Sequence, residues 1–203
     1  LILYHVGMFY VPWDWHVKSP RPVPALEPWM LLSAPWRLSL LFMVSGAALG
    51  LALQRGSTAA SGRARSKRLL LPLLLGVAVI VPPQAYLEVV EKLGYSGSYL
   101  DFLARYFAAD QSLCRGSDCL ILPTWNHLWF VAYLWVYTML VLALWRLGGT
   151  AWWVHPRWHG LTAGNRLLWW PCLLLALIRQ QLVLPFPSSH NLVWDWFNHA
   201  LYG

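Results

Sequence analysis

The chain has 203 residues, of which 58% are hydrophobic and 11% are charged, and its mean hydropathy is +0.47. A soluble domain carries about 25% charged residues, so this composition excludes a soluble globular protein and indicates an integral membrane protein. The formal net charge of +7 is not gathered in a soluble basic domain. We therefore expect the lipid bilayer, and not nucleic acid, as a partner.

The chain begins with an apolar segment that contains a histidine. Residues 1–12 resemble the second half of a membrane helix, because a complete span needs about 20 apolar residues and this segment ends at Pro12. His5 suits proton transfer near neutral pH, but it can also form an ordinary hydrogen bond to a neighbouring helix. No Met or basic leader precedes the segment, so we expect a truncated chain at this end.

Further segments are long and apolar enough to span a bilayer; they are residues 29–53, 69–87, 127–146 and 167–186. Residues 192–203 resemble a helix that has only begun, which predicts a truncation at the far end as well. Only helices of this length satisfy their backbone inside lipid. The sequence therefore predicts an all-α polytopic transmembrane helical bundle with four complete and two partial spans, in one partial domain of residues 1–203.

The connections between the spans differ in charge. Residues 54–68 carry only basic charges, those of Arg55, Arg63, Arg65, Lys67 and Arg68. The positive-inside rule places this loop in the cytoplasm, and alternation then places the loop 88–126 outside and the loop 146–166 inside. The outer loop contains Cys114 and Cys119, whose spacing permits a disulfide in an oxidising compartment. Two free thiols, or a metal site with ligands that are not apparent nearby, remain the alternatives.

Two basic groups are candidate binding residues. Arg65 and Arg68 are three positions apart at a helix start, which places them on one face where they can bind phosphate. The alternative is that they merely flank the inner end of a helix. Arg37 lies inside a span, so it either snorkels or lines a polar cavity. Asp195 is the acidic residue of the last partial span and is a candidate on that ground.

The remaining candidates are polar residues that could line a passage for a substrate. Ser45 in FMVSG lies in mid-span, where small residues also serve helix packing. Gln84 and Glu88 belong to PPQAYLE, whose Pro pair we expect to break a helix near its outer end, which frees carbonyl groups to face a cavity or only bends the chain. His127 in NHLWF either caps the next span or binds a substrate hydroxyl.

Together these stretches resemble the acyltransferase-3 family of multispanning membrane acyltransferases. The matching stretches occur in the family's order and are YHVGMFY, WRLSLLFMVSG, RSKRLLLPLLLGVAVIVPPQAYLE and NHLWF. They cover most of residues 4–146 and are most similar to the glucan biosynthesis protein C branch, whose members attach succinyl groups to periplasmic glucans. The resemblance implies a complete domain of about ten helices.

The resemblance also implies roles for particular residues. His5 matches the family's catalytic histidine, whose partner arginine would precede Leu1, and Arg65 and Arg68 match the residues that bind the phosphates of acyl-coenzyme A. The implied reaction moves an acetyl or succinyl group from cytoplasmic acyl-coenzyme A to a hydroxyl of an extracytoplasmic glycan or similar acceptor. It takes place at the bacterial inner membrane, and no metal is expected.

Two other classes of protein fit parts of the pattern. Broken helices and intramembrane charges also occur in transporters and channel-like proteins. In addition, His5, His127 and His199 could pair across helices as ligands of a haem. Dependence on an acyl-coenzyme A donor distinguishes the enzyme from both alternatives.

Overall fold

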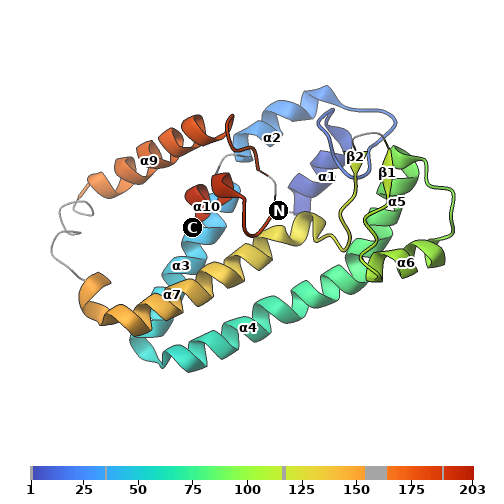
Figure 1. The fold of residues 1–203 in the computed structure, drawn as a ribbon. Coiled ribbons are helices and arrows are strands. Elements are labelled where there is room, and N and C mark those ends of the chain that lie inside the picture. The colour runs from blue at the N-terminus through green and yellow to red at the C-terminus, as the bar shows by residue number, and fades with distance from the viewer. Residues whose placement is uncertain (1, 35, 116–117, 154–163, 189) are drawn as a thin grey trace. The chain divides into compact units, whose positions relative to one another are not determined.

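The computed structural model describes residues 2–34, 36–115, 118–153, 164–188 and 190–203 (Figure 1). In chain order the elements are α1 (Ile2–Tyr10), the 3₁₀ turn η1 (Pro24–Leu26), α2 (Glu27–Ser33), α3 (Arg37–Arg55), α4 (Thr58–Leu75), the π-helical turn η2 (Gly76–Ile80), α5 (Val81–Leu93), α6 (Tyr99–Phe107), β1 (Cys114–Arg115), β2 (Asp118–Cys119), the 3₁₀ turn η3 (Asn126–Leu128), α7 (Trp129–Trp153), α9 (Arg166–Leu182) and α10 (Trp196–Tyr202). Apart from the short antiparallel pair β1–β2, the described residues confirm the predicted all-α class.

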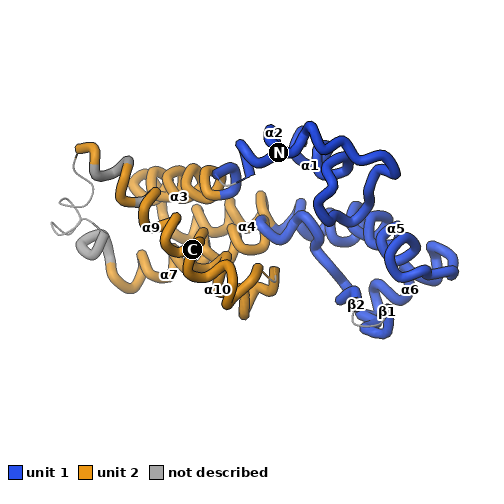
Figure 2. The backbone as a smooth tube through the Cα atoms, turned by 90° about the horizontal axis from the view of Figure 1, so that it is seen from above, with its two compact units in different colours: residues 1–38, 70–130 blue, residues 39–69, 131–203 orange. Residues whose placement is uncertain are grey.

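Within the described residues, three helical stretches are long and apolar enough to cross a membrane: Pro24–Arg55, Thr58–Leu93 and Asn126–Gly148. A shorter apolar helix covers Cys172–Leu182. The chain divides into a first unit of residues 1–38 and 70–130 and a second unit of residues 39–69 and 131–203 (Figure 2). Of the predicted inner loop 146–166, residues 154–163 lie outside the described part, and α7 extends into its beginning.

The predicted inner loop 54–68 is not a loop. Only Gly56 and Ser57 separate α3 from α4, and the basic residues that follow are helical. The Ser57 side chain accepts a hydrogen bond from the backbone N–H of Ala60 at 3.2 Å, which caps the first turn. Arg and Lys are good helix formers, so α4 begins well before the apolar segment. The predicted outer loop 88–126 likewise contains the end of α5, all of α6 and the β1–β2 pair.

The Pro82–Pro83 pair does not break the helix, contrary to the prediction. The turn before it becomes π-helical, and the N–H of Val81 bonds to the carbonyl of Gly76. In this pattern the carbonyl of Val77 would pair with position 82, where proline has no N–H to donate. The Tyr106 hydroxyl donates to that carbonyl at 2.9 Å instead. A side chain from α6 therefore repairs the hydrogen bond that the proline removes.

Tyr106 also fixes the segment that leads into η3. Its hydroxyl lies 2.9 Å from the carbonyl oxygen of Thr124, two positions before η3. Tyr106 lies on α6, and a capping box between Ser98 and Asp101 caps the N-terminus of this helix. Fully buried Phe102 and Tyr106 pack in one cluster with the buried side chains of α5, so the core of the first unit forms around this contact.

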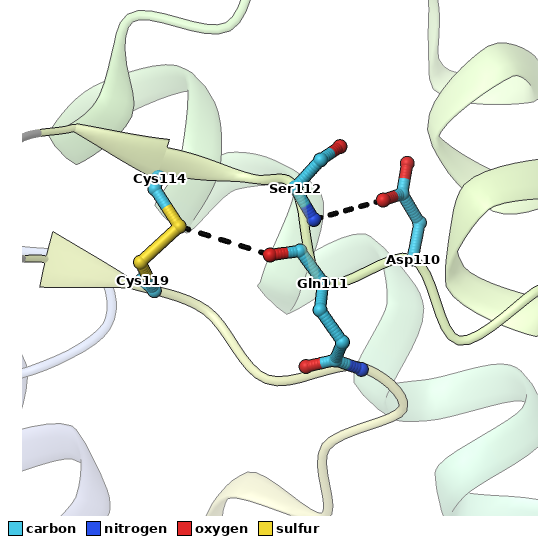
Figure 3. The surroundings of a disulfide bond; sticks show 5 residues. All are labelled: Asp110, Gln111, Ser112, Cys114 and Cys119. Carbon is cyan, nitrogen blue, oxygen red and sulfur yellow. Dashed lines mark hydrogen bonds between the residues drawn. A yellow bond between two sulfur atoms is a disulfide. The ribbon is translucent and has the colours of Figure 1, made fainter.

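The two cysteines of the segment 88–126 form a disulfide. Cys114 and Cys119 are bonded across the β1–β2 pair (Figure 3), so the free-thiol and metal alternatives for these two residues are wrong. The carboxylate of Asp110 accepts from the backbone N–H of Ser112 at 2.8 Å, just before the hairpin (Figure 3). The segment between α6 and η3 is thus closed by both covalent and hydrogen bonds.

In the second unit, helices α3, α4 and α7 pack against one another. Buried Leu49 and Leu53 of α3 form a cluster with Leu142 of α7. A Cβ at Gly62 of α4 would lie 3.1 Å from a methyl group of Leu142, so the glycine permits a close approach. The indole N–H of Trp135 donates to Ser66 at 3.0 Å, which adds a polar contact between α7 and α4.

The helix α10 is held through Asp195, which is 1% exposed. Asp195 is the N-cap of α10 and accepts from the backbone N–H of Asn198. Its carboxylate also accepts from the Tyr133 hydroxyl at 2.9 Å and from the Asn198 side-chain amide at 2.7 Å. The N–H of His190 donates to it at 2.8 Å. These contacts give Asp195 a role in joining α10 to α7.

We expect Asp195→Ala to destabilise the protein by about 3 kcal/mol or more. The change leaves the Tyr133 hydroxyl and the Asn198 amide without their acceptor, and each buried donor left unpaired costs about 1–3 kcal/mol. Thermal unfolding in detergent measures the loss, with Asp195→Asn, which keeps one acceptor oxygen, as the milder control. An Asp195→Ala protein as stable as the wild type would contradict this assignment.

We expect Tyr106 to make the stability sensitive to alkaline pH. Burial raises the pKa of Tyr106 to about 12, whereas a free tyrosine titrates at about 10. The folded chain holds this proton more tightly than the unfolded chain, so the contribution is complete below pH ~10 and is lost as pH rises toward ~12. Tyr106→Phe should reduce stability at neutral pH and flatten this alkaline decline. Unfolding measured at several pH values between neutral and ~12 tests both effects; a decline equally steep in Tyr106→Phe would show that another group causes it.

Candidate functional site

Two predicted site histidines lie together in the first unit. The ring centroids of His5, on α1, and His127, on η3, are 5.5 Å apart. Both side chains are partly buried. The structure thus brings together a histidine from the first helix and one that begins the Asn126–Gly148 helix.

Close backbone approaches at two glycines set the positions of these histidines. A Cβ at Gly7 would lie 2.3 Å from the sulfur of Met30, so a larger residue there would displace the Met30 side chain that packs α2 on α1. A Cβ at Gly76 would lie 2.4 Å from a methyl group of Leu128, which brings the π-helical turn close to η3. His5 is two residues from the first contact, and His127 is adjacent to the second.

Arg37 contacts the residue that precedes His5. Its guanidinium carbon lies 3.0 Å from the centroid of the Tyr4 ring. Such a cation–π contact stabilises a charge that is partly removed from water. Arg37, predicted either to snorkel or to line a polar cavity, therefore lies against an aromatic side chain beside the histidine pair.

Trp15 and His16, which sequence reasoning did not single out, belong to the same surroundings. The Trp15 ring is 5.7 Å from that of His5 and 4.8 Å from that of His16, measured between centroids. His16 Nδ1 lies 2.8 Å from an oxygen of Glu88. Glu88 was predicted to line the pocket, and its partner comes from the segment that follows α1. The stretch WDWHVK resembles an interfacial anchor, so its residue pattern does not predict this contact.

The segment that carries His16 folds back onto the end of α1. The ammonium group of Lys18 donates to the carbonyl of Met8 at 2.9 Å and also to that of Val11. The backbone N–H of Ser19 donates to the carbonyl of Phe9 at 2.9 Å. These bonds satisfy carbonyl groups that the end of a helix leaves without partners. The segment is thereby fixed close to His5.

Unused hydrogen-bonding atoms are also present in the first unit. The side-chain oxygen of Gln84 and the side-chain nitrogen of Asn126 are buried and have no hydrogen-bond partner among the described residues. A buried polar atom without a partner costs free energy. Gln84 was predicted to face a cavity, and its free acceptor suits a donor group of a bound substrate.

The second unit holds the predicted phosphate-binding residues. The guanidinium of Arg65, on α4, donates to the Ser45 hydroxyl at 2.6 Å and to the Ser45 carbonyl at 2.8 Å. The structure thus joins two residues that the sequence proposed for separate roles. Arg68 is exposed and forms no side-chain hydrogen bond or ion pair within the described part of the chain. Phosphate binding by these arginines stays a prediction.

His199 has a structural setting. Its Nδ1 lies 2.9 Å from the Tyr137 hydroxyl and its Nε2 lies 3.1 Å from the carbonyl oxygen of Leu192. Both ring nitrogens are therefore occupied, which does not suit a haem ligand. The residues that the structure describes contain no group of three or more His, Cys, Asp or Glu side chains placed to hold a metal ion.

Comparison with known proteins gives one match. A family model described as an acyltransferase domain matches residues 1–202, which include both units. Searches of curated proteins and of solved structures found no match. The matched range includes every residue of the candidate site described above.

Proposed function

The chain belongs to this acyltransferase domain family, and we propose that it transfers an acetyl or succinyl group from cytoplasmic acyl-coenzyme A to a hydroxyl of an extracytoplasmic glycan or similar acceptor. With its long apolar helices, the chain is an integral membrane acyltransferase. The donor, the acyl group and the acceptor are the parts that we propose.

The observation that carries the mechanism is the pairing of His5 with His127, 5.5 Å apart between ring centroids. Acyl transfer needs a base that takes the proton of the acceptor hydroxyl, or a nucleophile that carries the acyl group, and imidazole serves both purposes. His5 fills one of these roles, and His127 orients the acceptor or the acyl group. Gln84 and Glu88 supply further polar contacts.

Charge and exposure support a coenzyme A donor. Guanidinium groups bind phosphate through paired, charge-assisted hydrogen bonds. Arg68 is exposed on α4 and Arg65 lies one helical turn before it. Arg68 makes the first contact with the phosphates of the donor. Arg65 either keeps its hydrogen bonds to Ser45 or exchanges them for bonds to the phosphates.

The sidedness of the protein is also a proposal. The basic start of α4 belongs in the cytoplasm, where acyl-coenzyme A is made, according to the positive-inside rule. The Cys114–Cys119 disulfide supports an oxidising compartment for the segment 88–126. Both arguments agree with a bacterial inner membrane and an acceptor on its outer side.

A transporter or channel-like function is less well supported. It was suggested by the predicted break at Pro82–Pro83 and by charges inside the spans. The structure shows no such break, because the helix continues through the Pro pair. Arg37 and Asp195 each have a contact partner within their own unit. Consumption of acyl-coenzyme A distinguishes the two functions, since a transporter does not cleave the thioester.

We expect His5→Asn to abolish acyl transfer, because asparagine cannot take up the hydroxyl proton or carry the acyl group. Turnover of radiolabelled acyl-coenzyme A by the full-length protein in vesicles measures the effect, which should be about 100-fold or more. His190→Asn is the matched control, since this histidine is exposed and lies in the second unit. Wild-type turnover by a folded His5→Asn protein would refute the mechanism.

We expect Arg68→Ala to raise KM for acyl-coenzyme A by about tenfold and to leave kcat unchanged. The change removes a charge-assisted contact to phosphate, worth about 1.5–3 kcal/mol, that is present in both the bound and the transition state. Arg63→Ala, which removes another exposed charge from the same helix, should alter KM much less. Equal effects of the two changes would indicate general attraction and no specific site.

A further inference from the structure

The contact between His16 and Glu88 has no role in the mechanism above. We infer that His16 is the general base that takes the proton from the acceptor hydroxyl, and that Glu88 holds its imidazole in position. This inference rests on the proposed function and adds one catalytic residue to it. His5 is then left to carry or orient the acyl group.

The geometry of the pair is that of an oriented base. Glu88 lies 2.8 Å from Nδ1 of His16, so the carboxylate accepts the Nδ1–H and fixes the tautomer in which Nε2 is the proton acceptor. Nε2 of His16 has no hydrogen-bond partner within the described part of the chain. The His16 side chain is 26% exposed, so a hydroxyl can reach it.

Glu88 is itself held in place. Its side chain is 14% exposed, and its second oxygen lies 3.4 Å from the ammonium group of Lys92, one turn further along α5. Lys92 also pairs with Asp14 at 3.0 Å, and Asp14 is two positions before His16. The carboxylate of Glu88 is therefore held by His16 on one oxygen and by Lys92 on the other.

His16 belongs to the same cluster as the other two histidines of the first unit. The Trp15 ring contacts both His5 and His16, with centroids 5.7 and 4.8 Å apart. The His127 ring also contacts that of His5, with centroids 5.5 Å apart. A base on His16 is thus placed beside the residues that handle the acyl group.

The step balances without any further reagent. The proton of the acceptor hydroxyl moves to Nε2 of His16, and the acceptor oxygen forms a bond to the acyl carbonyl carbon. The bond from that carbon to the thioester sulfur breaks, either in this step or in an earlier transfer to His5. The thiolate regains the proton that His16 received, so one ester and one thiol replace one alcohol and one thioester.

The test measures acyl transfer to primary alcohols of graded acidity, with wild-type, His16→Gln and Glu88→Gln proteins of full length. A general base contributes about 100-fold or more, so kcat with a weakly acidic alcohol should fall by that factor in His16→Gln. The loss should shrink as the alcohol becomes more acidic, because such an alcohol needs less help to lose its proton. Glu88→Gln should show the same trend with a smaller loss.

Asp14→Asn is the control variant. Asp14 is 88% exposed, and an exposed ion pair contributes little to stability, so this change should leave the rates with all alcohols near those of the wild type. A purely structural role of His16 would lower the rates with all alcohols by one common factor. That result, or full activity of His16→Gln, would overturn the inference while leaving His5 and the proposed function intact. A wild-type protein that transfers no acyl group would refute both.

Discussion

The first unit depends on the bond between the Tyr106 hydroxyl and the carbonyl of Val77. Two consecutive prolines inside a membrane helix would leave a polar carbonyl in an apolar environment, which costs several kcal/mol. The π-helical turn and the hydroxyl from α6 remove that cost together. The same hydroxyl also contacts the carbonyl oxygen of Thr124. Tyr106 therefore both compensates for the missing proline N–H and holds the segment before η3.

The histidine cluster that we propose as the catalytic site is assembled by contacts that are local in space but distant in sequence. Gly76 lets the π-helical turn approach Leu128, next to His127, and Glu88 on the same continuous helix reaches His16. The helical stretch Thr58–Leu93 therefore contacts the segment of His127 through Gly76 and the side chain of His16 through Glu88. A change in its register at the Pro pair would move both, which gives the π-helical turn a functional meaning beyond its hydrogen bonds.

The helical class and three of the four complete spans were predictable from length and apolarity, whereas the predicted span 167–186 contains a shorter apolar helix in the described part of the chain. The start of α4 was not predictable, since Arg and Lys mark an inner loop by their charge but are also good helix formers. The Pro pair was misjudged for a related reason: its missing bond is supplied by Tyr106, 24 residues beyond Pro82. Local patterns made His5, His127 and Glu88 candidates, whereas the contact between His16 and Glu88 could not be predicted because the two residues are 72 positions apart.

The hydrogen bonds between Arg65 and Ser45 bear on how such a chain enters the membrane and binds an anion. A guanidinium that already donates hydrogen bonds to a serine costs less free energy to desolvate when the helix inserts into the membrane. A phosphate that replaces this acceptor gains only the difference between two sets of hydrogen bonds. At the donor site that we propose, the serine would thereby lower the affinity for phosphate and favour its exchange between turnovers.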